Sequence, residues 1–330
     1  MPGLVPKLML VMALTCGVLA TRALAEEWAV PDVDALPMDI FGRTVRDGRD
    51  MIVHTAATIG PDATDPAMRF SGNGLECQSC HLDAGTKKFG LPLAGVWGVF
   101  PQFIGRENQV RTLEDRINGC MERSMNGRAL PPDGPQMKAM LTYIRFISAN
   151  VPTGRSADGR ATPPLPLPTA ASDPQHGAAV FAATCALCHQ ADGQGKRWGP
   201  EDAAQRHRYQ FPPLWGPDSY NDGAGMARPI SAASFIRANM PFGTDFAHPM
   251  LSAQDAFDVA VFIDGQTRPH RLGNELDFPD RALKPADATY PPYLGPFPPS
   301  QHLTGPWQPI QQWLKDNARS LRSGLPVPHG

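Results

Sequence analysis

The stretches CQSCH (77–81) and CALCH (185–189) decide the fold of this 330-residue chain. Each has the form C-x-x-C-H, the attachment signature of a c-type haem. Two thiols one helical turn apart add to the two vinyl groups of the haem, and the histidine that follows reaches the iron. The composition of 6 cysteines and 9 histidines predicts roughly 0.003 chance copies of this pattern. Two copies therefore indicate two covalently bound haem c groups.

The motifs assign six residues to haem attachment and proximal ligation. The predicted attachment residues are Cys77, Cys80, Cys185 and Cys188, and the predicted proximal iron ligands are His81 and His189. A zinc site explains the pattern less well, because zinc does not require a histidine directly after the second cysteine. A redox dithiol of the thioredoxin type needs a βαβ context that the sequence does not contain.

The segments around the motifs predict a mainly α protein with two cytochrome c-type domains. HGAAVFAATCALCH (176–189) is an alanine-rich helical stretch that runs into the second attachment site. Ser252 and Asp255 form a capping box before the apolar helix AFDVAVFID (256–264). In the first half, PDGPQMKAMLTYIRFIS (132–148) repeats its apolar residues with helical period.

The N-terminus and the proline distribution suggest how the chain is divided. An apolar run of about 13 residues followed by Ala23-Leu24-Ala25 predicts a signal peptide over 1–25, cleaved after about Ala25. We expect an exported, periplasmic protein without a membrane span. The predicted units are a first haem domain (26–152), a Pro-rich linker (153–174), a second haem domain (175–268) and an irregular Pro-rich tail (269–330). The net charge of −2 gives no basic field for nucleic acid.

The sixth ligand of the second haem iron is expected to be a methionine, because a thioether raises the potential and suits an electron carrier. The candidates are Met226, Met240 and Met250. Met240 is favoured because it follows the predicted helix SAASFIRAN (231–239) and precedes a proline that forces a loop. Met250 is the alternative, but it stands almost at the start of the next helix.

The second ligand of the first iron is less evident from the residues alone. Cys120 is the cysteine left over after haem attachment, and it competes with Met121, Met125, Met137, Met140 and His54. An unpaired thiol in an oxidising compartment is oxidised unless it is protected or used. Arg116 and Arg123 would favour its thiolate. The residues leave open a ligand or nucleophile role, a buried free thiol and an intermolecular disulfide.

Several segments resemble the dihaem thiosulfate dehydrogenases. The first haem domain of that family is similar to SGNGLECQSCHLDAGTKKFGLPLAGVWG (71–98) and RINGCMERSMNG (116–127). The second resembles RYQFPPLWGPDSYNDGAGMAR (208–228), FIRANMPFG (235–243) and QDAFDVAVFI (254–263). The tail segment YLGPFPPSQHLTGPWQPI (293–310) resembles the C-terminal wrap of the family. The similarity covers most of the expected mature chain.

The resemblance implies an activity, the oxidation of two thiosulfates to tetrathionate with release of two electrons. It implies that Cys120 is the distal ligand of the catalytic haem, opposite His81. Arg106, Arg116 and Ser124 match positions that hold the anionic substrate. The resemblance also implies a second haem ligated by His189 and Met240. Some members carry a lysine just before this methionine and exchange the two ligands, whereas this chain has Asn239, so a plain His/Met site is expected.

The implied mechanism makes Cys120 the reacting group. It leaves the iron or swings away from it, bonds to one thiosulfate sulfur, and is released when a second thiosulfate attacks. The electrons pass from the His/Cys haem to the His/Met haem, and then to an external acceptor such as a small cytochrome c. One alternative is a Sox-system-like cytochrome that conjugates thiosulfate to a carrier protein. Another is a dihaem electron carrier in which Cys120 only tunes the potential. Tetrathionate reduction is the same chemistry in reverse.

Overall fold

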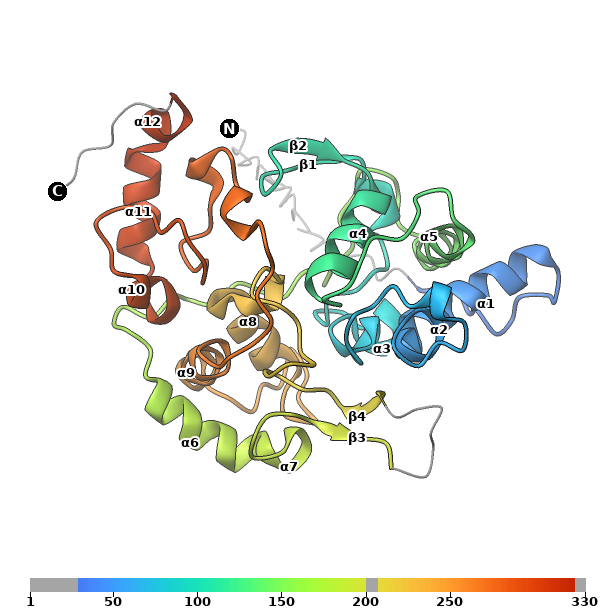
Figure 1. The fold of residues 1–330 in the computed structure, drawn as a ribbon, viewed down its shortest axis with the longest axis horizontal. Coiled ribbons are helices and arrows are strands. Elements are labelled where there is room, and N and C mark those ends of the chain that lie inside the picture. The colour runs from blue at the N-terminus through green and yellow to red at the C-terminus, as the bar shows by residue number, and fades with distance from the viewer. Residues whose placement is uncertain (1–28, 200–206, 324–330) are drawn as a thin grey trace, which may run out of the picture.

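The computed structural model describes residues 29–199 and 207–323. The predicted signal peptide and its cleavage point lie outside these residues. Helices account for most of the regular structure, and they gather in two groups that the chain visits in order (Figure 1). Within the described ranges, no helix is both long and apolar enough to cross a membrane.

The first group of helices is built around a helix pair close to the attachment motif CQSCH. It contains α1 (Ile40–Val53), α2 (Thr55–Ile59), α3 (Leu82–Gly85), α4 (Leu113–Arg123) and α5 (Pro135–Ile147). Helix α5 packs against α1 and buries the face predicted from its sequence, including Met137, Met140 and Ile144. Gly48 permits this crossing, because a Cβ there would collide with the backbone of Ala139.

The second group repeats this arrangement around CALCH. It contains α6 (Pro174–Thr184), α7 (Ala186–His189), α8 (Pro229–Asn239) and α9 (Ala253–Asp264). The predicted helices over 176–189, 231–239 and 256–264 are confirmed, and α9 begins at the predicted capping box of Ser252 and Asp255. Helix α6 crosses α9 at Gly177, where a Cβ would collide with the carbonyl of Asp258.

Strands are short and lie in two hairpins. β1 (Gln102–Ile104) pairs with β2 (Gln109–Arg111), with Phe103 opposite Val110. β3 (Lys196–Arg197) pairs with β4 (Tyr209–Phe211). Six 3-10 turns complete the regular structure of the described residues, at Pro66–Met68, Cys77–Ser79, Trp97–Val99, Gly225–Ala227, Asn274–Leu276 and Arg281–Leu283. The prediction of a mainly α protein is confirmed.

The tail departs from the prediction of an irregular segment. Its second half carries α10 (Pro299–Thr304), α11 (Gln308–Asp316) and α12 (Ala318–Ser323). The abundant prolines favoured the prediction of irregular structure, but the segment also contains a short apolar helix face. On this face Ile310 and Leu314 stand four residues apart and are both buried. These helices lie beside the second group, on the side opposite α1 (Figure 1).

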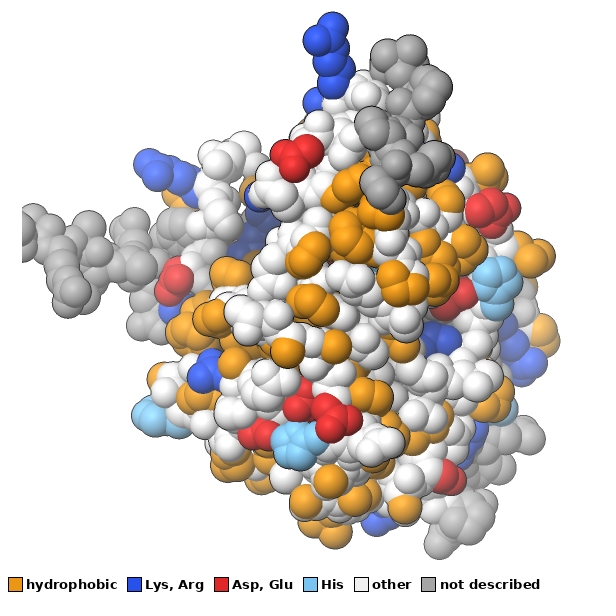
Figure 2. Space-filling view, turned by 90° about the vertical axis from the view of Figure 1, so that its left-hand side faces the viewer, with side chains coloured by type: hydrophobic (Ala, Val, Ile, Leu, Met, Phe, Trp, Pro, Cys, Tyr) orange, Lys and Arg blue, Asp and Glu red, His pale blue; other side chains and the backbone are white. Residues whose placement is uncertain are grey.

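On the face of the molecule seen in Figure 2, acidic and basic side chains are interspersed.

Candidate active site

The first attachment motif is held in place by side chains on both of its flanks. The backbone N–H of Cys77 donates to Oγ1 of Thr55 at 2.9 Å. The preceding residue, Glu76, accepts from the backbone of Ala56 at 3.0 Å and from Nε of Arg208 at 3.0 Å. Arg208 comes from the second half of the chain, so both halves position this motif.

The histidines that end the two attachment motifs each have a hydrogen bond of the kind that prepares an imidazole to bind a metal. Nδ1 of His81 lies 2.5 Å from the carbonyl oxygen of Leu91, and Nδ1 of His189 lies 2.8 Å from that of Pro212. Because a carbonyl only accepts, we place the ring hydrogen on Nδ1 in both residues, which leaves Nε2 to bind a metal. Burial lowers the pKa of His189 and keeps its ring neutral, the form that ligates iron.

The guanidinium group of Arg237, in the second domain, could bind an anionic group of a cofactor. Arg237 lies on α8, three residues before Met240, and its buried Nε has no hydrogen-bond partner among the described residues. A buried guanidinium nitrogen without a partner is costly, and a carboxylate such as a haem propionate would satisfy it. The cysteine pairs, the free Nε2 atoms and this cation fit c-type haem.

Cys120 differs from Cys77 and Cys80 in its protonation. Burial raises the pKa of Cys77 and Cys80 to about 12. Burial also acts on Cys120, but the charge of Arg116, the neighbouring His81 side chain and the charge of Arg106 outweigh it and lower the pKa of Cys120 to about 6. Cys120 is therefore the thiol that favours its thiolate form at neutral pH.

Local helix geometry places Arg116 beside this thiol. Helix α4 begins at a capping box of Thr112 and Asp115, and residues four apart lie on the same helix face. Nη1 of Arg116 donates to Sγ of Cys120 at 3.4 Å. The Arg116 side chain is exposed and Cys120 is half-buried, so an anion from solvent can reach this pair.

Arg106 reaches the same region from the turn between β1 and β2. Its Nη1 donates to the carbonyl of Gly223 at 2.6 Å and lies 3.3 Å from a carboxylate oxygen of Asp277. Burial lowers the pKa of Arg106, despite the nearby carboxylate. Arg106 thus has a structural partner as well as an influence on Cys120.

Ser124 ends helix α4 one turn after Cys120. Its side chain is half-buried, and its carbonyl accepts from Nδ2 of Asn73 at 3.0 Å. Within 29–199 and 207–323, no residue forms a hydrogen bond with its hydroxyl at normal distance. The structure therefore brings Cys120, Arg116, Arg106 and His81 together, with Ser124 at the end of the same helix.

Sequence reasoning missed the partner of Arg123. This arginine was expected to favour the Cys120 thiolate, but it forms a buried two-bond ion pair with Asp277, at 2.7 and 2.9 Å. Tyr290 donates to the same carboxylate at 2.7 Å. No local pattern announces this pair, because its members are 154 residues apart.

The other candidate ligands have different surroundings. Met121, Met125, Met137 and Met140 are buried in the apolar core of the first domain, and His54 pairs with Asp50 at 2.6 Å. In the second domain, Met240 directly follows α8 and packs against the core, half-buried. The Met250 side chain is 59% exposed.

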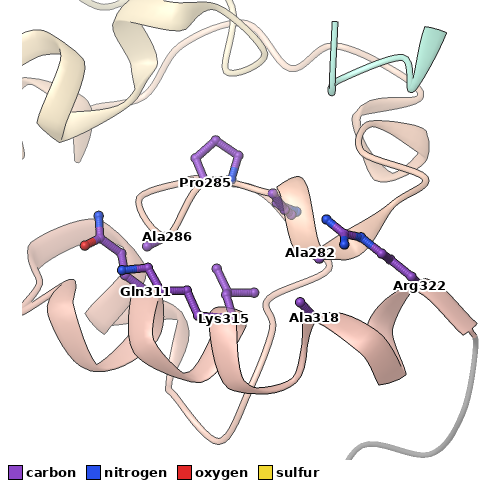
Figure 3. A pocket seen from close by; sticks show the side chains of 9 residues that line it. Ala282, Pro285, Ala286, Gln311, Lys315, Ala318 and Arg322 are labelled. Atoms are coloured by element: carbon purple, nitrogen blue, oxygen red, sulfur yellow. The ribbon is translucent and has the colours of Figure 1, made fainter. Parts of the chain in front are cut away.

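A separate pocket of about 490 Å³ lies in the tail, between the segment 282–286 and helices α11 and α12 (Figure 3). Its lining includes Lys284, Gln311, Lys315 and Arg322. None of the predicted site residues lines it, so it is distinct from the thiol site.

The fold and the two attachment sites define a dihaem c-type cytochrome, with two covalently bound haem c groups. Residues 69–153 match the family model described as SoxA/TsdA, cytochrome c domain, and residues 174–267 match the cytochrome c model. The chain is 42% identical over 244 residues to thiosulfate dehydrogenase of Allochromatium vinosum, covering 73% of this chain and 84% of that protein. Thiosulfate dehydrogenase of Thiomonas intermedia is 39% identical, with 72% and 70% covered.

Solved structures give the same relationship. Thiosulfate dehydrogenase TsdBA from Marichromatium purpuratum has a TM-score of 0.67 and 36% identity, covering 76% of this chain and 51% of that chain. Among the sequence relatives, the SoxA subunit of Rhodovulum sulfidophilum L-cysteine S-thiosulfotransferase is 31% identical over only 90 residues, 27% of this chain and 29% of that protein. The chain belongs to the thiosulfate dehydrogenase family.

Proposed function

We propose that this protein oxidises two thiosulfate ions to tetrathionate in the periplasm and passes the two electrons to an external acceptor, such as a small cytochrome c. One observation carries the proposal. Cys120 is held as a thiolate-favouring sulfur beside His81 and Arg116, within the segment that matches the SoxA/TsdA family model. The similarity to thiosulfate dehydrogenases over most of the chain supports the choice of substrate.

The charges around the thiol suit two anions that repel each other. Thiosulfate is a dianion, so a site that joins two of them needs fixed positive charge and hydrogen-bond donors. The exposed guanidinium of Arg116 is placed to receive the incoming anion. Arg106 is held by Gly223 and Asp277, and it contributes positive charge from the turn between β1 and β2. The Ser124 hydroxyl is available as a further donor.

Cys120 acts as the nucleophile in the proposed reaction. Its thiolate forms a bond to the outer sulfur of thiosulfate, which gives an S-sulfosulfanyl cysteine and releases two electrons. The outer sulfur of a second thiosulfate then attacks the outer sulfur of this adduct. The Cys120–sulfur bond breaks, tetrathionate leaves and the thiolate is restored. Bound haem supplies the one-electron redox centres that take up the two electrons.

We assign the iron ligands on the same basis. His81 and Cys120 are the proposed ligands at the first site, and His189 and Met240 at the second. The hydrogen bonds at Nδ1 of both histidines support their assignment. The exposure of Met250 favours Met240. Cys77, Cys80, Cys185 and Cys188 are the proposed thioether residues.

A steady-state assay tests the function. Purified holoprotein is mixed with thiosulfate and ferricyanide, and tetrathionate is measured directly. We expect tetrathionate to form without a second protein, and Cys120→Ala to lose this activity while both haems stay attached. Formation of a product only when a carrier protein is added would favour the Sox-like alternative. Full activity of the Cys120→Ala variant would refute the nucleophile. The reverse assay, with tetrathionate and a reductant, measures the other direction.

Export is tested separately on the protein isolated from cells. Cleavage of the proposed signal peptide after about Ala25 leaves Glu26 as the first residue. Intact mass and N-terminal sequencing of the periplasmic fraction check this expectation. A product that retains residues 1–25 would contradict it.

A further inference from the structure

The loop that supports His81 has an unusual backbone. Phe89 and Leu91 have positive φ values of 60° and 52°, a conformation that bulky residues rarely adopt without support from their surroundings. The carbonyl of Leu91 accepts the hydrogen bond from Nδ1 of His81. The position of this strained loop therefore determines how the His81 ring is held.

The support for Phe89 comes from other parts of the chain. Its backbone N–H donates to the carbonyl of Gly159 in the linker at 2.7 Å. Its carbonyl accepts from Nδ2 of Asn239 at 3.0 Å. Its ring lies against the ring of Phe246, with 4.0 Å between the centroids. Asn239 and Phe246 stand on the two sides of Met240, so the Met240 loop holds the His81 loop.

Asn239 is built for this contact. It is the last residue of α8, it is 4% exposed, and its Nδ2 also donates to the carbonyl of Phe235 at 3.1 Å. Its Oδ1 is buried without a partner among the described residues. Turning the amide over would place Oδ1 against two carbonyl oxygens, so Nδ2 must face them. The next residue, Met240, continues the chain with its N–H bonded to Ile236 at 2.8 Å.

We propose that Asn239 is a positioning residue that ties His81 to Met240 across the domain boundary. The connection runs from His81 through the Leu91 carbonyl to Phe89, and from the Phe89 carbonyl through the Asn239 side chain to Met240. It rests on the assignment of His81 and Met240 as iron ligands under the proposed function. A shift of the Met240 loop is transmitted to the His81 ring, so the two haem sites are adjusted together.

The proposal predicts opposite changes at the two haems in an Asn239→Ala variant. Weakening the His81–Leu91 hydrogen bond makes the imidazole a poorer donor, which raises the potential of the first haem. A looser Met240 lowers the potential of the second haem. We therefore expect a redox titration to show the two potentials moving toward each other. Imidazole should displace Met240 with about fivefold higher affinity, the equivalent of one neutral hydrogen bond.

A matched control is available in the tail. Asn317 caps the end of α11 and donates from Nδ2 to the carbonyl four residues earlier, Trp313, at 2.9 Å, but among the described residues its side chain forms no bond to the first domain. We expect Asn317→Ala to change neither potential. A second variant, Phe246→Ala, removes a ring that is 42% exposed, and should move both potentials in the same directions as Asn239→Ala.

The result that overturns the proposal is specific. Asn239→Ala and Phe246→Ala must first be shown to retain two haems and a native circular dichroism spectrum. If the potential of the first haem is then unchanged in both variants, Asn239 does not link the two sites. The titration is run without thiosulfate. Its outcome is therefore independent of the tetrathionate assay, which decides the proposed function.

Discussion

The ion pair between Arg123 and Asp277 joins the tail to the active-site helix, and its removal gives a quantitative prediction. Asp277 receives two bonds from Arg123, one from the hydroxyl of Tyr290 and a longer one from Arg106. The side chains of Arg123 and Asp277 are 9% and 7% exposed. Asp277→Asn keeps the shape of the side chain but removes its charge.

The expected loss of stability follows from the burial of this pair. An ion pair deprived of one charge leaves the other buried and uncompensated, which costs about 3–5 kcal/mol. Asparagine can still accept from Arg123, so we expect about 3 kcal/mol, the lower end of that range. For a cooperative unit of about 300 residues, with an unfolding entropy of about 2.1 cal/mol/K per residue, this loss corresponds to a Tm lower by about 5 °C. Arg106 keeps its bond to the Gly223 carbonyl but loses the charge of its carboxylate partner, so the KM for thiosulfate should rise.

The assay is thermal unfolding followed by circular dichroism, with steady-state kinetics on the same preparations. Asp280→Asn is the control. It lies three residues away in the same tail and pairs with Arg322, whose side chain is 58% exposed. Because the Arg322 side of this pair is open to solvent, the pair contributes about 0–1 kcal/mol, so the control should unfold close to the wild type. Equal Tm values for Asp277→Asn and the wild type would refute the reasoning, because the buried pair would then contribute nothing.

Other predictions concern the thiol, a lysine and the methionines. Arg116→Gln should lower kcat/KM for thiosulfate roughly tenfold to a hundredfold, the value of one bond to a charged group, whereas Arg111→Gln should not. Burial lowers the pKa of Lys284 from 10.5 to about 8. Between pH 8 and pH 10.5 the unfolded chain therefore binds more protons than the folded chain. The free energy of unfolding rises across this range by about 3 kcal/mol. Lys284→Met should remove this contribution, as measured by denaturant unfolding at pH 8 and pH 10; an unchanged pH dependence would contradict it. Met240→Leu should abolish the methionine–iron charge-transfer band of the ferric protein, and Met250→Leu should leave it; the reverse outcome would identify Met250 as the ligand.

Much of the site could be read from short stretches, because its chemistry depends on local spacing. The C-x-x-C-H motifs need only one helical turn, so they predict haem attachment without knowledge of the fold. The capping box at Ser252 and the apolar period of α5 likewise depend on residues three or four apart. Arg116 and Cys120 also stand four apart on one helix, so their contact follows once α4 is recognised.

Contacts between distant segments could not be read in this way. Arg106 reaches the thiol region only because the β1–β2 turn folds back against the tail, where the N–H of Phe278 donates to its carbonyl at 2.7 Å. The helices α11 and α12 were missed because their apolar stripe is short and lies among prolines, and burial against the second domain stabilises them.

The sequence by itself determined the cofactor type, the helical class and the unpaired thiol, since each depends on residue identity and spacing within a few turns. The tertiary structure decided which charges act on that thiol. Arg123 pairs instead with Asp277, which lies 154 residues later in the chain. Asn239 was joined to Phe89, 150 residues earlier. Such pairings depend on how the whole chain closes, and no local period encodes them.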